Sequence, residues 1–223
     1  MTQPATDIEL LDAWRRGDAT AGNRLVKRYY GPLLRFFELR SRTPEDLTQE
    51  ALLACAASPE AFRAESSFRS YVFGIARRVL LKSLSAEYHA QRMSSFDATP
   101  TAQGTSLSAL FARRQEQHFL LMVLASLPED TQTLIALHYW ENLKSREIAE
   151  VMGIPTSTVT SRLSRARQRL ADGVRAMATA ATSEALLADL EGWTRSLARA
   201  EDAPAIPDGV TSTVAQMLAR YRG

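Results

Sequence analysis

The sequence predicts an all-α protein of two small helical domains, joined by a flexible linker and followed by a helical C-terminal extension. The 223 residues are enough for two small domains that each bury a hydrophobic core. Apolar residues recur at intervals of three and four, which is the helical period. Residues 94–108 have few apolar side chains and no period, a pattern typical of a linker.

The composition excludes several classes of protein. With 45% hydrophobic and 23% charged residues, the chain is typical of a globular protein and not of a disordered one. The single cysteine excludes an internal disulfide, and with only three scattered histidines we expect no metal site, no cofactor and a cytoplasmic location. Residues 1–14 lack the apolar core of an export signal, and no run of about twenty apolar residues predicts a membrane span.

The first domain is expected over residues 1–92. Asp7 is predicted to cap a first helix, which ends at the turn of residues 16–18. A second helix carries Gly31-Pro32, where a kink is expected. Thr43 is the predicted N-cap of a third helix, which extends to about Ala57.

A loop and a long amphipathic helix complete this domain. The loop covers residues 58–67, and the helix that follows begins near Phe68 and ends near Arg92. Cys55, on the apolar side of the preceding helix, is interpreted as a small core residue.

The linker is assigned to residues 93–110 and the second domain to residues 111–175. Its predicted helices include residues 131–142, 145–152 and about 157–171. Residues 176–223 form the extension. Helices are expected there at 183–200 and 210–221, separated by a breaker segment with two prolines.

The charge is distributed unevenly. The formal net charge is only +2, yet residues 69–92 hold five basic side chains and one acid, and residues 144–175 hold seven basic side chains and three acids. Two separate basic regions predict two contacts with one polyanion.

Residues 143–170 have the pattern of a helix-turn-helix. A short helix, a turn at Gly153 and a second helix follow in the required order. The outer face of the second helix carries hydroxyls suited to base edges and guanidinium groups suited to phosphates. The predicted DNA-binding residues are Ser157, Thr158, Ser161, Arg162, Arg165 and Arg169. The alternative is a basic, solvated helix of a three-helix bundle.

Aromatic and basic side chains are interleaved between residues 62 and 82. Phe62, Phe68, Tyr71 and Phe73 lie among Arg63, Arg69, Arg77, Arg78 and Lys82. Such a mixture can stack on unpaired bases and neutralise the nucleic-acid backbone. The same helical spacing is also typical of core aromatics, so both interpretations remain open.

Together these motifs resemble the extracytoplasmic-function (ECF) family of bacterial RNA polymerase sigma factors. Region 2 of that family is similar to residues 7–92, and region 4 is similar to residues 124–170. The segments that carry the resemblance are Arg16-Gly17-Asp18, residues 45–50, residues 66–71, residues 75–78, Leu127-Pro128-Glu129, residues 147–153 and residues 158–167.

The resemblance implies a dissociable subunit of RNA polymerase with no catalytic residues of its own. It implies contacts with the clamp helices of the largest core subunit through Asp46, Leu47, Gln49 and Glu50, and a contact of region 4 with the flap. From the residues alone, that acidic face could equally be a solvated helix start. The helix of residues 157–169 would read the minus-thirty-five element as duplex.

The resemblance also assigns promoter melting to the first domain, where a flipped base of the minus-ten element would be held. The residues implied are Arg63, Ser66, Ser67, Phe68, Arg69, Tyr71, Arg77, Arg78 and Lys82. The family commonly has Trp, Asn and Asp where this chain has Tyr71, Arg78 and Lys82, so this surface is more basic than usual.

The extension is a further departure, because typical members end soon after the recognition helix. It is either a regulator of promoter or core binding, in place of a separate anti-sigma factor, or a passive addition.

Two rival functions for the whole chain stay open. One is a helix-turn-helix regulator that acts without polymerase, and the other is a non-enzymatic adaptor. No Walker A, G-x-G-x-x-G or H-E-x-x-H motif supports an enzyme.

Overall fold

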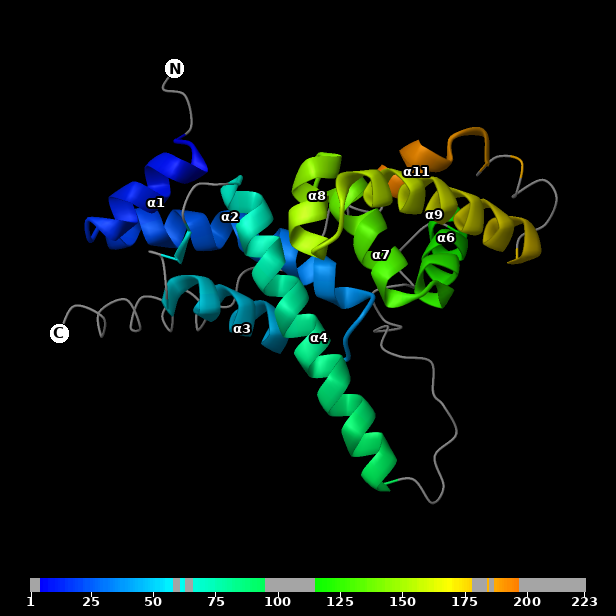
Figure 1. Ribbon diagram of the computed structural model, residues 1–223, viewed down its shortest axis with the longest axis horizontal. Coiled ribbons are helices and arrows are strands. Elements are labelled where there is room, and N and C mark those ends of the chain that lie inside the picture. Colours follow the sequence, from blue (N-terminus) through cyan, green and yellow to red (C-terminus); the bar gives the residue numbers. More distant parts are fainter. Residues whose placement is uncertain are drawn as a thin grey trace. The chain divides into compact units, whose positions relative to one another are not determined.

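The computed structural model describes residues 5–57, 61–62, 66–94, 115–177, 184 and 187–196. Every regular element in these ranges is helical, which confirms the predicted all-α class (Figure 1). The described helices fall into two compact units, one with α1 to α4 and one with α6 to α11. The predicted linker covers residues 93–110, but residues 93 and 94 still belong to α4; residues 95–110 and the predicted helix at 210–221 lie outside the described residues.

The first helix, α1 (Asp7–Arg15), begins one residue earlier than the predicted cap implies. Thr6 is the N-cap, since its hydroxyl accepts from the Glu9 backbone N–H at 3.3 Å. The Glu9 carboxylate accepts in return from the Thr6 N–H at 2.7 Å, completing a capping box. Asp7 instead accepts hydrogen bonds from Arg28 and Tyr29 of the next helix, which makes it a tertiary contact.

Helix α2 (Ala19–Glu38) supplies more buried apolar residues to the first core than any other described helix. It continues through Pro32 as one element, and its buried face includes Tyr29, Leu33 and Phe37. The indole of Trp14 lies so close to Gly22 that an added Cβ would be 2.9 Å from the ring nitrogen. The absence of a side chain at Gly22 therefore lets α1 pack against α2.

Two more helices complete the first unit. Helix α3 (Pro44–Ala57) begins at proline, as predicted, with Glu45 and Asp46 in its first turn. Helix α4 (Phe68–Ser94) has 27 residues and is the longest described helix (Figure 1). Cys55 is buried, and its burial raises the pKa of the thiol to about 12, in agreement with a core role.

The second unit differs from the sequence prediction where one helix was expected over residues 131–142. Helix α7 (Glu129–Ile135) begins earlier, directly after Pro128, and is followed by a π-helical turn, η2 (Ala136–Trp140). Helix α6 (Gln115–Ser126) precedes α7. The wider π-turn gives Tyr139 and Trp140 a register that an α-helix would not, and such turns occur often at functional sites.

The helix-turn-helix consists of α8 (Ser145–Met152) and α9 (Thr156–Met177). Helix α9 continues about two turns beyond the predicted end. In the extension, α11 (Leu190–Ser196) covers part of the helix predicted at 183–200, and Asp189 caps it by accepting from the Gly192 N–H at 2.9 Å. None of the described helices is both long and apolar enough to span a membrane.

Candidate nucleic-acid interface

The turn between α8 and α9 sets the orientation of the second helix. Gly153 ends α8 in the left-handed conformation, with φ of 66°, and the Ile154 N–H donates to the carbonyl of Ala149 at 3.1 Å. The carbonyl of Pro155 then accepts from the backbone N–H groups of Thr158 and Val159. These bonds fix the direction in which α9 leaves the turn.

The inner face of α9 is apolar and anchors the helix in the second unit. It contributes Val159, Leu163, Ala166, Leu170 and Val174, all of which are buried. The six residues predicted to bind DNA lie on the remaining surface. Ser157, Ser161, Arg165 and Arg169 are exposed, and Thr158 and Arg162 are half-buried.

Hydrogen bonds order the hydroxyl end of this face. The Ser161 hydroxyl donates to the carbonyl of Thr158 at 3.0 Å and accepts from Arg165 Nη2 at 3.4 Å. The serine therefore positions the guanidinium of Arg165 one turn further along the helix.

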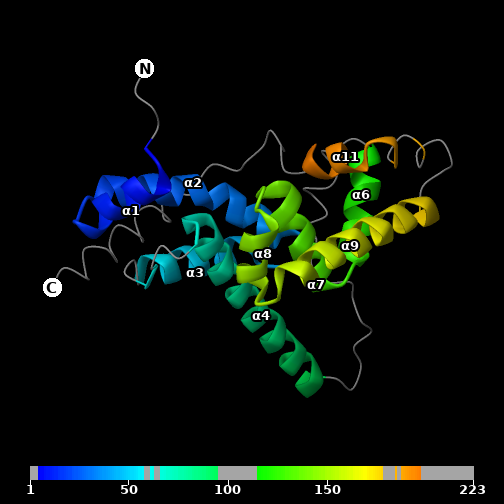
Figure 2. The same ribbon diagram turned by 45° about the horizontal axis from the view of Figure 1, so that its top comes forward.

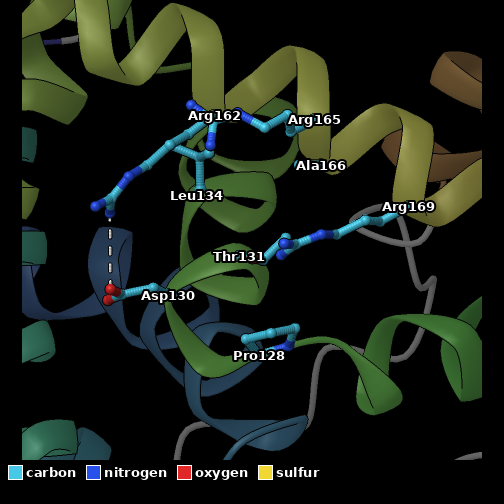
Figure 3. Close-up of a pocket in the computed structure, with 8 residues that line it drawn as sticks. All are labelled: Pro128, Asp130, Thr131, Leu134, Arg162, Arg165, Ala166 and Arg169. Carbon is cyan, nitrogen blue, oxygen red and sulfur yellow. Dashed lines mark ion pairs between the residues drawn. The ribbon is translucent and has the colours of Figure 1, made fainter.

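Three of the predicted arginines surround a hollow of about 240 Å³ between α7 and α9 (Figure 3). Arg162, Arg165 and Arg169 line it from α9, and Pro128, Asp130 and Thr131 line it from α7. Arg162 forms an ion pair with Asp130, with 3.7 Å between Nη1 and Oδ2. Sequence reasoning missed Asp130, because its partner lies more than thirty residues away and no local pattern connects the two.

In the first unit, aromatic rings pack around the start of α4. Phe68 is 5% exposed, and its ring contacts those of Tyr29, Phe62 and Tyr71 at centroid distances between 5.4 and 6.0 Å. Phe68 and Phe62 are therefore core residues, whereas Tyr71 is half-buried. The core interpretation fits Phe68, and the stacking interpretation remains open for Tyr71.

Polar contacts hold this corner together. Arg15 Nη2 donates to the carbonyl of Phe62 at 2.6 Å, which ties the segment before α4 to α1. The Ser67 hydroxyl accepts from the Ser70 N–H at 3.2 Å and so caps α4. The guanidinium of Arg69 lies 5.6 Å from the centre of the Tyr29 ring.

The other residues predicted for this surface lie in different environments. Arg78 and Lys82 are exposed, whereas Ser66 and Arg77 are half-buried. Arg63 lies outside the described residues. Lys82 Nζ is 2.8 Å from Glu50 Oε1 of α3, so a residue predicted to bind DNA pairs with one predicted to bind polymerase.

The predicted polymerase-binding residues do not all share one surface. Asp46 and Gln49 are exposed and Glu50 is half-buried, so these three are accessible on α3. Leu47 is only 6% exposed and packs in the core of the first unit. Its role is therefore to hold α3 in place, and the accessible face is polar and acidic.

The described residues offer no metal site, since they contain no cluster of three or more histidine, cysteine or acidic side chains suited to an ion. His138, on η2, has a lowered pKa, because burial and the nearby Arg167 disfavour its charged form. It is a packing residue against Tyr139, with 4.6 Å between ring centroids.

Comparison with known families identifies both units. The family model for sigma-70 region 2 matches residues 23–88, and that for sigma-70 region 4 matches residues 120–170. The chain thus has the two domains that define a small sigma-70 type transcription factor.

Similar proteins show to which group of sigma-70 type factors the chain belongs. An ECF RNA polymerase sigma-E factor from Haemophilus influenzae is 31% identical over 182 residues, which are 76% of this chain and 96% of the relative. The Escherichia coli K12 protein of the same name is 29% identical and covers 76% of this chain. The chain therefore belongs to the ECF sigma factors, which bind core RNA polymerase and direct it to promoters.

Solved structures confirm the fold. CnrH, determined in complex with the cytosolic domain of CnrY, has a TM-score of 0.56 at 20% identity and covers 76% of this chain. The sigma factor RpoE of Bartonella quintana, determined with the anti-sigma factor NepR, has a TM-score of 0.52 at 23% identity and covers 66%.

Proposed function

We propose that the two units divide the work of promoter recognition. The unit assigned to residues 1–92 binds core polymerase and opens the minus-ten element, and the unit assigned to residues 111–175 reads the minus-thirty-five element as duplex. Residues 93–110 connect them, and residues 176–223 form an additional segment. The protein acts in the cytoplasm and contributes no catalytic group of its own.

The observation that carries this proposal is the outer surface of α9. Ser157, Thr158 and Ser161 lie at its amino-terminal half, where a helix in the major groove meets base edges. Arg162, Arg165 and Arg169 follow around the hollow, where guanidinium groups suit phosphate oxygens. This order of hydroxyls and cations along one helix suits duplex reading.

In the first unit, the proposal rests on the partial exposure of Tyr71. Its ring is backed by the buried rings of Phe62 and Phe68, so it forms a rigid platform for an unpaired base. Stacking of one base on an aromatic side chain contributes about 1–3 kcal/mol, which offsets part of the cost of melting. Arg69, Arg78 and Lys82 supply positive charge for the strand backbone.

Core polymerase binds the acidic face of α3 in this proposal. Asp46, Gln49 and Glu50 are accessible there and would meet a complementary basic surface on the polymerase clamp. The pairing of Glu50 with Lys82 links this surface to the one proposed for melting.

A flap contact is assigned to the second unit. We also expect an anti-sigma protein among the partners, since RpoE of Bartonella quintana was solved with one.

Run-off transcription with purified core polymerase over a genomic template library tests the function. We expect initiation at discrete promoters only when the protein is present, and the products report the sequences recognised. In parallel, binding of the same promoter duplexes without polymerase should be weak. Tight, specific binding by the protein alone would favour the regulator instead, and failure to associate with core would favour the adaptor.

A further inference from the structure

The extension contacts the second unit at a defined place. Helix α11, orange in Figure 2, packs on η2, and Trp140 Nε1 donates to the carbonyl of Thr194 at 2.9 Å. Thr194 is 1% exposed, and its hydroxyl donates to the carbonyl of Leu190 at 2.7 Å. The hydrogen bond from the Trp140 indole to the Thr194 carbonyl fixes the position of α11 along η2.

A cluster of charged and aromatic groups lies at the same contact. Glu191 Oε1 of α11 is 3.2 Å from Arg167 Nε of α9 and accepts from the Tyr139 hydroxyl at 3.4 Å. Arg167 Nε also donates to the Tyr139 hydroxyl at 2.6 Å. Glu191 Oε2 pairs with Arg195, so one carboxylate neutralises cations on two helices.

Arg167 belongs to the same helix as the arginines proposed to bind DNA, but it lies on another flank. Arg162, Arg165 and Arg169 line the hollow toward α7, whereas Arg167 meets η2 and α11. A helix in the major groove has a phosphate backbone on either side, so cations on both flanks can reach phosphates. Arg167 is still partly accessible, with 44% of its side chain exposed.

We propose that α11 keeps Arg167 from contacting promoter phosphates, so that the extension lowers the affinity of the second unit for duplex DNA. The inference depends on the proposed role of α9 as the duplex-reading helix. Removing the charge of Glu191 would take away the carboxylate partner of Arg167 and leave it the neutral Tyr139 hydroxyl, so its exposed guanidinium could make one more phosphate contact. Each such contact steepens the dependence of log K on log salt by about 0.9, and at 0.1 M salt it tightens binding by roughly threefold to tenfold.

The test uses holoenzyme reconstituted from core polymerase and the full chain. Affinity for a promoter duplex is measured across a range of KCl concentrations for wild type, Glu191→Gln, Arg167→Gln and the double variant. We expect Glu191→Gln to tighten binding and steepen the salt slope. Arg167→Gln should change little alone and should cancel the gain in the double variant.

Two further variants make the test specific. Glu184→Gln removes the same charge from an exposed position of the extension and should leave the salt slope unchanged. Trp140→Phe removes the donor to Thr194, so it should release α11 and tighten binding as Glu191→Gln does.

Either of two results would overturn the inference. One is an unchanged affinity in Glu191→Gln. The other is an equal loss of affinity from Arg167→Gln with and without Glu191, which would mean that Arg167 already contacts DNA. Failure of the unmodified holoenzyme to bind any promoter would count against the proposed function itself.

Discussion

At the scale of single residues, the turn of the helix-turn-helix depends on the backbone of Gly153. An added Cβ would meet no atom within 4 Å, so the position needs glycine for its φ of 66° and not for space. Gly153→Ala should cost about 1–2 kcal/mol, the penalty of a left-handed conformation for an L-residue. Hydrogen exchange of the α8 and α9 amides measures the loss.

Gly74 provides the matched control. It also has open space around its Cβ position, but it lies within helix α4 and has no positive φ. Gly74→Ala should slow exchange in α4, because alanine stabilises a helix by up to about 1 kcal/mol relative to glycine. Equal destabilisation by both substitutions would contradict the conformational argument for Gly153.

The predicted helix cap at Asp7 and the predicted aromatic surface at Phe68 and Tyr71 show how far the role of a single residue can be predicted from the sequence. Asp7 has the chemistry of an N-cap, but its carboxylate bonds to Arg28 and Tyr29, and Thr6 takes the capping role. The helical spacing of Phe68 and Tyr71 suits both a core and a stacking surface. Burial separates the two residues, and the burial of Phe68 depends on Tyr29, which is distant in sequence, as well as on Phe62 in the preceding loop.

At the scale of elements, the second unit depends on a close approach of α6 and α9 at Gly173. A Cβ there would lie 2.4 Å from Val123 Cγ1, and Val123 is fully buried. Gly173→Ala should therefore destabilise the unit by about 1–3 kcal/mol through overpacking. Thermal unfolding followed with a probe in the second unit measures the effect.

A double-mutant cycle tests the cause. Val123→Ala removes the methyl group that clashes, so the pair should cost less than the two single substitutions together, by about 0.5–3 kcal/mol. Strict additivity would show that the cost of Gly173→Ala does not come from contact with Val123.

Elements were predictable to different degrees. The start of α3 at Pro44 and the bounds of α8 follow from local signals, namely proline with acids in the first turn and a glycine after the last turn. The π-turn at η2 has no such local signal, and its Tyr139 and Trp140 make tertiary contacts with α9 and α11. The same tertiary contacts place α11, so its partner could not be read from the extension alone.

At the scale of the whole molecule, the family and the order of its domains were predictable, because motifs at fixed spacing carry them. The ion pairs between helices were not predictable. Lys82 of α4 pairs with Glu50 of α3, and Arg162 of α9 pairs with Asp130 of α7. These pairs connect surfaces that the sequence presents as independent.

The division of work between the units predicts which variants regain their initiation rate on a promoter that is already unpaired. Tyr71→Ala should slow initiation on duplex promoters, because one stacked base would no longer offset the cost of unpairing. A template with mismatches across the minus-ten element removes that cost, so it should restore much of the rate. Arg165→Ala should impair initiation equally on both templates, because the minus-thirty-five element remains duplex in each.

Single-round transcription on matched and mismatched templates checks this difference, with one control for each unit. Tyr88→Ala removes an aromatic ring that is 56% exposed on α4, away from Phe62 and Phe68, and should leave both rates unchanged. Arg175→Ala removes a cation near the end of α9, where it pairs with Asp172, and should also have little effect. If the mismatched template rescued Arg165→Ala as well as Tyr71→Ala, duplex reading and strand separation would not belong to different units.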